Sequence, residues 1–345
     1  MITNISLKNV RKFENVNLNI NSKNVLLFGQ NAIGKTTILE AINYASITKS
    51  HRTNNIKEVI KDEKEFADIK ITYDKKIYRV ILSNIGKKVS INNKEIKKIS
   101  EYIGNFPTIF FSPNDLEIIT SSPTARRQFI NQEISQFSTN YITCLNTYNR
   151  LLQERNLCLK ELDLESDKKV LDVITLQLIE YAEKIMIERE KFINEINSVI
   201  NDIHSKINSK EFIKIIYQPS ITIKNLYEFY QSKYQTDIIS HQTNYGIHRD
   251  EIVFMINDKN ALKYASQGQI RNIILSTKLS LCKIIYKYKN KYPILLLDDV
   301  LSELDITRQN NLLKIINEFG QTFISTADTS SLENEILKKY QLIKL

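Results

Sequence analysis

The fold is decided by one stretch of sequence, Gly29-Gln30-Asn31-Ala32-Ile33-Gly34-Lys35-Thr36-Thr37. Its first eight residues fit the pattern G-x4-G-K-[ST], in which a glycine-rich loop binds phosphate groups through backbone N–H groups. The apolar run 24–28 predicts a buried strand before the loop, and residues 35–47 predict a helix after it. Because the motif requires this order of strand, loop and helix, the sequence predicts a nucleotide site in an α/β domain.

The chemistry of the loop assigns a role to each type of residue. Gly29 and Gly34 permit the backbone angles that turn N–H groups towards an anion, and the helix N-terminus adds its dipole. Lys35 is expected to reach the β- and γ-phosphates, and the Thr36 hydroxyl to ligate Mg²⁺. The alternative is a tight glycine turn before an ordinary helix.

A second strand signal ends in two acidic residues. The apolar run 294–297 is followed by Asp298 and Asp299. A carboxylate at the C-terminal end of a buried strand can hold Mg²⁺ beside a phosphate loop, and we expect this of Asp298. Asp299 is then expected to polarise the water that attacks the γ-phosphate, or to act as its base. The alternative is an acidic helix N-terminus.

Charge is unevenly distributed along the chain. Residues 1–115 hold 19 Lys and Arg against 11 Asp and Glu, whereas the remaining residues are almost balanced. A basic segment favours a polyanionic partner, although a codon bias towards lysine would give the same composition. No apolar run reaches the roughly 18–20 residues of a membrane span. The N-terminus lacks a signal-peptide pattern, and the 3 cysteines favour a cytoplasmic protein without disulfides.

The middle of the chain has a different periodicity. From residue 122 onward, apolar residues recur at alternating spacings of three and four, interrupted by the polar turn 163–168. This pattern predicts two long antiparallel helices. Strand signals return at residues 252–256. We therefore predict an ATPase head formed by residues 1–115 and 245–345, lobe I, and an inserted helical lobe formed by residues 116–244, lobe II.

Several motifs together resemble the RecF family of recombination and repair proteins, short relatives of the SMC chromosome ATPases among the ATP-binding-cassette ATPases. The resemblance covers nearly the whole chain. It implies an ABC-type P-loop ATPase head with an inserted, mainly helical lobe that contains a short antiparallel hairpin. The segments that carry it, besides the phosphate loop, are Ser50-His51-Arg52-Thr53, residues 111–116, residues 123–129, residues 246–250, Ser266-Gln267-Gly268-Gln269 and residues 297–305.

The resemblance implies a site that is completed by a second copy of the chain. Ser266, Gly268 and Gln269 of one copy would cap the γ-phosphate of the ATP held by Lys35 of the other, so that Lys35, Ser266 and Asp299 act in catalysis. It also implies ATP and Mg²⁺ as cofactors, an ATP-dependent homodimer, DNA as a ligand and a RecR-type recombination mediator as a partner. The implied protein clamps DNA and helps to load recombinase at single-strand gaps in repair and replication.

The sequence departs from the pattern of cassette ATPases at three places. No histidine follows His248, and Thr326 stands at the end of the strand where a switch histidine is common. Residues 109–112 lack the glutamine that often links the core to the helical lobe. Asp299 replaces the more frequent glutamate, and its shorter reach predicts slow hydrolysis. Together with the resemblance, this implies a slow, DNA-stimulated ATPase that works as a switch.

Weaker signals leave alternatives open. Five lysines are candidates for DNA phosphate contacts or for a solvated face: Lys87, Lys88, Lys94, Lys97 and Lys98. His51 and Arg52 suit either a ligand contact or packing, and residues 248–250 favour an ion pair. Rival functions are the ATPase subunit of a membrane transporter and a structural ATP switch without hydrolysis. Against a transporter stand the helical insertion, the basic segment and the missing histidine.

Overall fold

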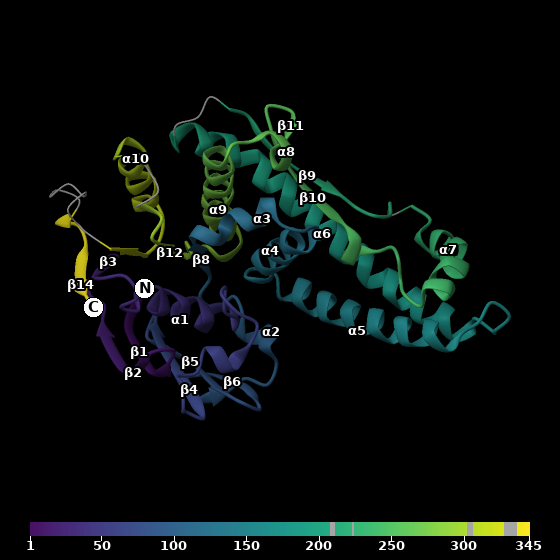
Figure 1. The fold of residues 1–345 in the computed structure, drawn as a ribbon, viewed down its shortest axis with the longest axis horizontal. Coiled ribbons are helices and arrows are strands. Elements are labelled where there is room, and N and C mark those ends of the chain that lie inside the picture. Colours follow the sequence, from purple (N-terminus) through teal and green to yellow (C-terminus); the bar gives the residue numbers. More distant parts are fainter. Residues whose placement is uncertain (208–210, 223, 302–305, 328–336) are drawn as a thin grey trace. The chain divides into compact units, whose positions relative to one another are not determined.

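The computed structural model describes residues 1–207, 211–222, 224–301, 306–327 and 337–345, and only the backbone of residues 306–308. The chain forms two compact units, traced in Figure 1. The first unit comprises the described parts of residues 1–116, 202–210 and 271–345, and the second unit those of residues 117–201 and 211–270. Among the described residues, no helix is long and apolar enough to cross a membrane.

A parallel sheet forms the centre of the first unit. Its strand order is β14-β3-β13-β12-β8, and all neighbours run parallel. The strands are β3 (Asn24–Phe28), β8 (Thr108–Phe111), β12 (Ile294–Asp298), β13 (Thr322–Thr326) and β14 (Gln341–Lys344). Three of the five, β3, β8 and β12, are almost continuously apolar, as is typical of strands buried on both faces, and β13 is buried throughout. Since parallel strands end at one edge, the ends of β3 and β12 meet there.

An antiparallel sheet lies in the same unit, in the order β2-β1-β4-β5-β6-β7. Alternate residues of its strands face the core, for instance Ile5, Leu7, Ile69 and Val80. Its strands are β1 (Ile2–Val10), β2 (Phe13–Asn19), β4 (Phe66–Tyr73), β5 (Lys76–Ser83), β6 (Gly86–Ile91) and β7 (Lys94–Glu95).

Helix α1 (Lys35–Ile47) joins these sheets into one core. Ile38, Leu39 and Ile42 belong to the same buried cluster as β1, β4 and β5 of the antiparallel sheet and β3 and β12 of the parallel one. Gln321 adds a polar link, because its side chain accepts from the N–H of Ile2 and donates to the carbonyls of Ile2 and Ser22. The phosphate loop therefore lies between a rigid strand and a fully packed helix.

The second unit is mainly helical. A helical hairpin is formed by α5 (Thr139–Glu161) and the 39-residue α6 (Lys169–Ile207), joined by the predicted polar turn. The last residues of α6, 202–207, belong to the first unit. A three-stranded antiparallel sheet has the order β11-β10-β9. The other elements of this unit are α3 (Glu117–Thr120), α4 (Pro123–Ser135), β9 (Ile213–Gln218), α7 (Leu226–Ser240), β10 (Glu251–Ile256), β11 (Lys259–Asn260) and α8 (Ala261–Tyr264).

The boundary of the second unit differs from the predicted one. The second unit extends to residue 270, whereas the sequence predicted a return to the first unit at residue 245. The strand signal at 252–256 is β10, but it pairs with β9 and β11 rather than with strands of the ATPase core. Helix α9 (Gln267–Lys289) carries the chain back into the first unit, and α10 (Ile306–Asn317) follows β12.

Candidate functional site

The phosphate loop leaves the end of β3 and opens α1, as the motif predicts. Gly34 has φ 109°, in the region that favours glycine, and a Cβ there would lie 2.3 Å from the ring of Phe13. Ala32 also has a positive φ, of 62°. The side-chain ammonium of Lys12 donates to the Ala32 carbonyl, and lies 5.8 Å from the centre of the Phe13 ring. The turn between β1 and β2 thus supports the loop from outside.

Lys35 is buried over the loop that it follows. Its Nζ donates to the carbonyls of Gly29 at 2.6 Å and of Gln30 at 2.9 Å. Burial lowers the pKa of Lys35, while the charges of Asp299 and Asp298 oppose the shift and that of Lys12 adds to it. The ammonium therefore interacts with both carboxylates that the sequence singled out, although they lie more than 260 residues away in the chain.

Asp298 is the last residue of β12 and contacts the loop directly. Its Oδ1 accepts from the Thr36 hydroxyl at 2.9 Å and from the Ser325 hydroxyl at 2.7 Å. Burial raises the pKa of Asp298 and the neighbouring Asp299 adds to this, whereas the two hydroxyls and the charge of Arg52 lower it. A hydroxyl and a carboxylate thus meet at the edge of the sheet, beside the Lys35 ammonium.

Ser325 is a site residue that the sequence did not single out. The parallel register pairs it with Asp298, and its Oγ also accepts from the backbone N–H of Asp299 at 3.0 Å. One hydroxyl therefore holds both acidic residues, whereas the sequence pattern points to Thr326 at the strand end. A single serine at the end of an apolar strand carries no motif, and only the register of the sheet reveals its place.

A buried acidic residue of α1 organises a second group near the loop. Glu40 is 1% exposed and accepts two hydrogen bonds from the guanidinium of Arg11, at 2.7 and 3.1 Å. Ser50 donates to the same carboxylate, and Arg52 lies 3.7 Å from it. Although burial opposes the change, the hydrogen bonds from Arg11 and Ser50 and the charge of Arg11 lower the pKa of Glu40. The segment 50–53 is therefore fixed to α1.

His51 packs within that segment. Its ring centre lies 3.9 Å from that of Phe110 in β8, and burial lowers the pKa of His51 to about 4. The packing alternative for His51 thus has direct support, because its imidazole is kept neutral and lies in van der Waals contact with an aromatic ring, at an interplanar angle of 31°.

The segment 266–269 caps α9. Ser266 precedes the first helical residue, and its backbone N–H donates to the side chain of Gln269 at 2.8 Å. The N–H of Gln269 donates back to the Ser266 hydroxyl at 3.3 Å, which is a capping box. Gln269 also donates to Glu211, while Ser266 and Gly268 are exposed and a Cβ at Gly268 would meet no atom within 4 Å. The segment belongs to the second unit, and residues 302–305 of the acidic motif lie outside the described residues.

The five lysines do not share one surface. Lys87 is half-buried, and its Nζ donates to the carbonyl of Thr48 at 2.5 Å, at the end of α1. Lys88 is the next residue of β6 and therefore faces the opposite side of the sheet. Exposed positions are occupied by Lys88, Lys94, Lys97 and Lys98.

Residues 246–250 connect the helices of the second unit. Asp250 is buried and pairs with the buried Arg189 of α6 at 2.7 Å, as the ion-pair interpretation predicted. His248 Nε2 donates to the Thr243 carbonyl at 3.0 Å, so its Nδ1 accepts from Tyr148 of α5 at 2.8 Å. Burial lowers the pKa of His248 to about 4, which keeps this neutral tautomer. The motif is thus a structural junction.

The chain is similar to known proteins over nearly its full length. A family model described as an AAA domain matches residues 4–211. DNA replication and repair protein RecF of Bacillus cytotoxicus is 39% identical, over 99% of this chain and 96% of that protein. DNA replication and repair protein RecF of Acholeplasma laidlawii is 38% identical, over 95% of this chain and 93% of that protein.

Solved structures give the same result. The recombination mediator protein RecF-ATP in the RecFOR pathway is 30% identical, with a TM-score of 0.89 over 96% of this chain and 93% of that one. An SMC head bound to the C-winged helix domain of ScpA, 15% identical with a TM-score of 0.54 over 99% of this chain and 94% of that one, shares the fold. The similarity over nearly the full length agrees with the phosphate loop and with the Thr36–Asp298 contact. The chain therefore belongs to the RecF family of DNA replication and repair proteins.

Proposed function

We propose that this chain is an ATP-dependent DNA-binding protein of recombinational repair and replication. Its ATP-bound dimer clamps DNA and helps to load recombinase at single-strand gaps. The observation that carries the proposal is the hydrogen bond of 2.9 Å between Thr36 and Asp298, next to Lys35, in a chain of the RecF family. It brings together Thr36 and Asp298, which lie more than 260 residues apart in the sequence and which we assign to the two halves of the ATP site.

ATP is the proposed cofactor of the loop 29–37. The N–H groups of residues 32–36 and the start of α1 form the anion site, and Lys35 neutralises the β- and γ-phosphates. Lys35 is well suited to this role, because its ammonium is already held against the loop by the carbonyls of Gly29 and Gln30.

Mg²⁺ is the proposed metal, held by Thr36 and Asp298. Both offer oxygen atoms, the donors that Mg²⁺ prefers, and the two side chains already contact each other. The buried Asp298 has a raised pKa without a divalent cation, so a positive ion beside it would stabilise its charged form. When bound, Mg²⁺ neutralises charge on the phosphates. Asp299, on the same turn, is the proposed polariser or base for the attacking water.

The proposed assembly is a homodimer with ATP at its interface. Ser266, Gly268 and Gln269 of one copy would contact the γ-phosphate held by the other. The capping box at the start of α9 supports this, because it orders a helix N-terminus whose exposed serine and glycine leave room for a ligand. DNA and a RecR-type mediator are the proposed partners, and the solved relatives named for the RecFOR pathway support the second.

DNA-binding titrations of the purified chain with ATP, with ADP and without nucleotide test this function. We expect tight binding only with ATP, and ATP turnover that is slow and increases when DNA is added. Binding that ignores the nucleotide would contradict an ATP-controlled clamp. Absence of turnover with and without DNA would instead favour a switch that binds ATP and does not hydrolyse it.

A further inference from the structure

A pocket with both polar and apolar lining lies in the first unit at the C-terminal end of α1, away from the phosphate loop at its N-terminal end. Its volume is about 160 Å³. Since a water molecule takes about 30 Å³ in the liquid, it has room for a group larger than one water. Two lysines, Lys49 and Lys87, line it from two segments far apart in the sequence. The rest of the lining consists of the apolar Ile56 and Val59 and of the polar residues Tyr44, Thr48, Ser50, Thr53, Asn54 and Asn55.

The two ammonium groups make this pocket positive. Burial lowers the pKa of Lys87, and the charge of Lys49 lowers it further, so the lysines are close enough to repel each other. Lys49 is exposed and makes no hydrogen bond or ion pair within the described residues. No carboxylate is among the described residues that line the pocket. A bound anion would relieve this repulsion.

One opposing effect is already partly offset within the protein. The C-terminal end of a helix carries partial negative charge, which disfavours an anion. Here the Lys87 ammonium donates to the carbonyl of Thr48, the C-cap of α1, at 2.5 Å and lies 3.2 Å from its hydroxyl, so a positive charge already offsets part of this effect. The ammonium of Lys49 can therefore contact the bound anion.

Neutral donors on the next segment match a phosphate group. Thr53 accepts from the N–H of Asn55 through its hydroxyl oxygen, which leaves the hydroxyl proton for a ligand. Asn54 is exposed beside it. Hydroxyl, amide and ammonium groups are the usual protein partners of DNA phosphates. The segment is held in place because Ser50 donates to the buried Glu40 and accepts from the N–H groups of residues 52 and 53.

We propose that this Lys49–Lys87 pocket binds one phosphate group of the DNA backbone. The inference rests on the proposed DNA-binding function and names residues for it. Lys49 makes the direct charge contact, Thr53 and Asn54 supply neutral donors, and Lys87 positions the end of α1. This places Lys87 apart from Lys88, Lys94, Lys97 and Lys98, which face elsewhere or lie beyond the pocket.

The test compares Lys49→Gln with Lys57→Gln. Lys57 is an exposed lysine of the same segment that does not line the pocket, so the two variants lose the same charge in the same region. The melting temperatures of both variants are first compared with that of the wild type, to verify that the variants are folded. DNA affinity is then measured with ATP over a series of salt concentrations. In Lys49→Gln the slope of log K against log salt should fall by about 0.7–0.9, the value for one lost phosphate contact, and in Lys57→Gln it should not change. The Lys49→Arg variant should have the same slope as the wild type, because arginine keeps the positive charge.

Other outcomes overturn the proposal in distinguishable ways. Equal effects of Lys49→Gln and Lys57→Gln would reduce the pocket to a general electrostatic contribution. A wild type that binds no DNA would refute the proposed function together with the pocket. A third experiment measures the melting temperature with inorganic phosphate. If phosphate stabilises the wild type but not Lys49→Gln, while both bind DNA equally, the pocket binds free phosphate instead of DNA.

Discussion

Asp299 combines an unusual backbone conformation with the position that we propose for the catalytic base. Its φ of 52° lies in the left-handed region, which costs most residues energy but is tolerated by Asp and Asn. The hydrogen bond from its N–H to Ser325 holds it there. Strain of this kind persists only where the surrounding structure imposes it, and it occurs often at functional sites. The chain direction therefore changes between Asp298, the proposed metal ligand, and Asp299.

The Asp299→Asn variant removes the side-chain charge of residue 299 and keeps its backbone conformation. Asn adopts the same left-handed conformation, so the variant should fold and bind ATP, while Lys35, Thr36 and Asp298 are unchanged. Loss of a general base typically lowers the rate by about 100-fold or more, and we expect turnover to fall on this scale. Asp258→Asn is the matched control, since Asp258 has a φ of 61° in an exposed turn of the second unit. Wild-type turnover in Asp299→Asn would remove this residue from the mechanism.

Among individual residues, the sequence could predict those site residues that belong to a local motif. The loop 29–36 and the pair Asp298–Asp299 were found because each is contiguous and follows an apolar strand. Ser325, Lys12 and Glu40 were not, since each acts through one contact made by the tertiary fold. For the same reason, the sequence does not distinguish DNA contacts from a solvated face for the five lysines. Residue spacing does not reveal that Lys87 turns towards Thr48.

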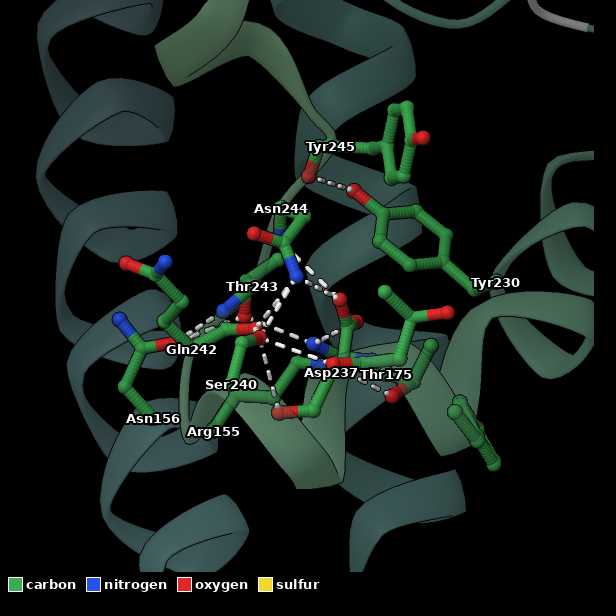
Figure 2. Close-up of polar contacts among 12 residues, drawn as sticks. Arg155, Asn156, Thr175, Tyr230, Asp237, Ser240, Gln242, Thr243, Asn244 and Tyr245 are labelled. Atoms are coloured by element: carbon green, nitrogen blue, oxygen red, sulfur yellow. Dashed lines mark hydrogen bonds and ion pairs between the residues drawn. The ribbon is translucent and has the colours of Figure 1, made fainter.

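Among the elements, the helical hairpin is held by a buried charge. Figure 2 shows Arg155 of α5 surrounded by polar groups of the second unit. Its guanidinium lies 2.9 Å from Asp237 of α7, donates to Thr243 at 2.7 Å and to Thr175 of α6 at 3.0 Å. The rings of Tyr230 and Tyr234 lie 5.2 and 5.7 Å from it. Arg155 and Asp237 are 0% and 1% exposed, so each charge depends on the other.

Asp237→Asn should therefore destabilise the second unit strongly. Removing one partner of a buried ion pair costs about 3–5 kcal/mol, because the remaining charge is left uncompensated. Glu154→Gln is the control, since it breaks the exposed pair with Arg150 on the same hairpin, where about 0.5 kcal/mol or less is expected. Thermal and urea unfolding of both variants would measure the difference. Equal melting temperatures would show that the buried pair contributes no more than a surface pair.

Element types were easier to predict than the pairing of strands. The periodic segments after residue 122 are helical, because a long apolar stripe is sufficient to identify an amphipathic helix. The first predicted helix is nevertheless divided into α4 and α5, which are separated at residues 136–138. Residues 252–256 were correctly predicted as a strand but placed in the wrong sheet. The pattern of one strand does not specify its neighbours, and the partner strand β9, Ile213–Gln218, was not recognised.

For the whole molecule, the proposed site requires two copies. Lys35, Thr36 and Asp298 belong to the first unit, and Ser266 and Gly268 to the second, where they are exposed at the start of α9. If each α9 N-terminus meets the nucleotide of the other copy, ATP becomes part of the interface. ADP lacks the γ-phosphate and so loses the group that both copies contact. Dimer formation should then depend on ATP and be weak without it.

Ser266→Arg tests this assembly. The larger side chain should block closure of the dimer by its bulk, while ATP binding to the monomer stays close to that of the wild type, because the phosphate loop is untouched. Loss of the capping box should cost about 1 kcal/mol of stability, too little to unfold the unit. Ser232→Arg is the control, since it makes the same substitution at an exposed position of α7. Analytical ultracentrifugation with ATP and with ADP should give an ATP-dependent dimer for the wild type and Ser232→Arg, and a monomer for Ser266→Arg. A dimer that is indifferent to nucleotide, or a Ser266→Arg chain that dimerises normally with ATP, would refute the shared site.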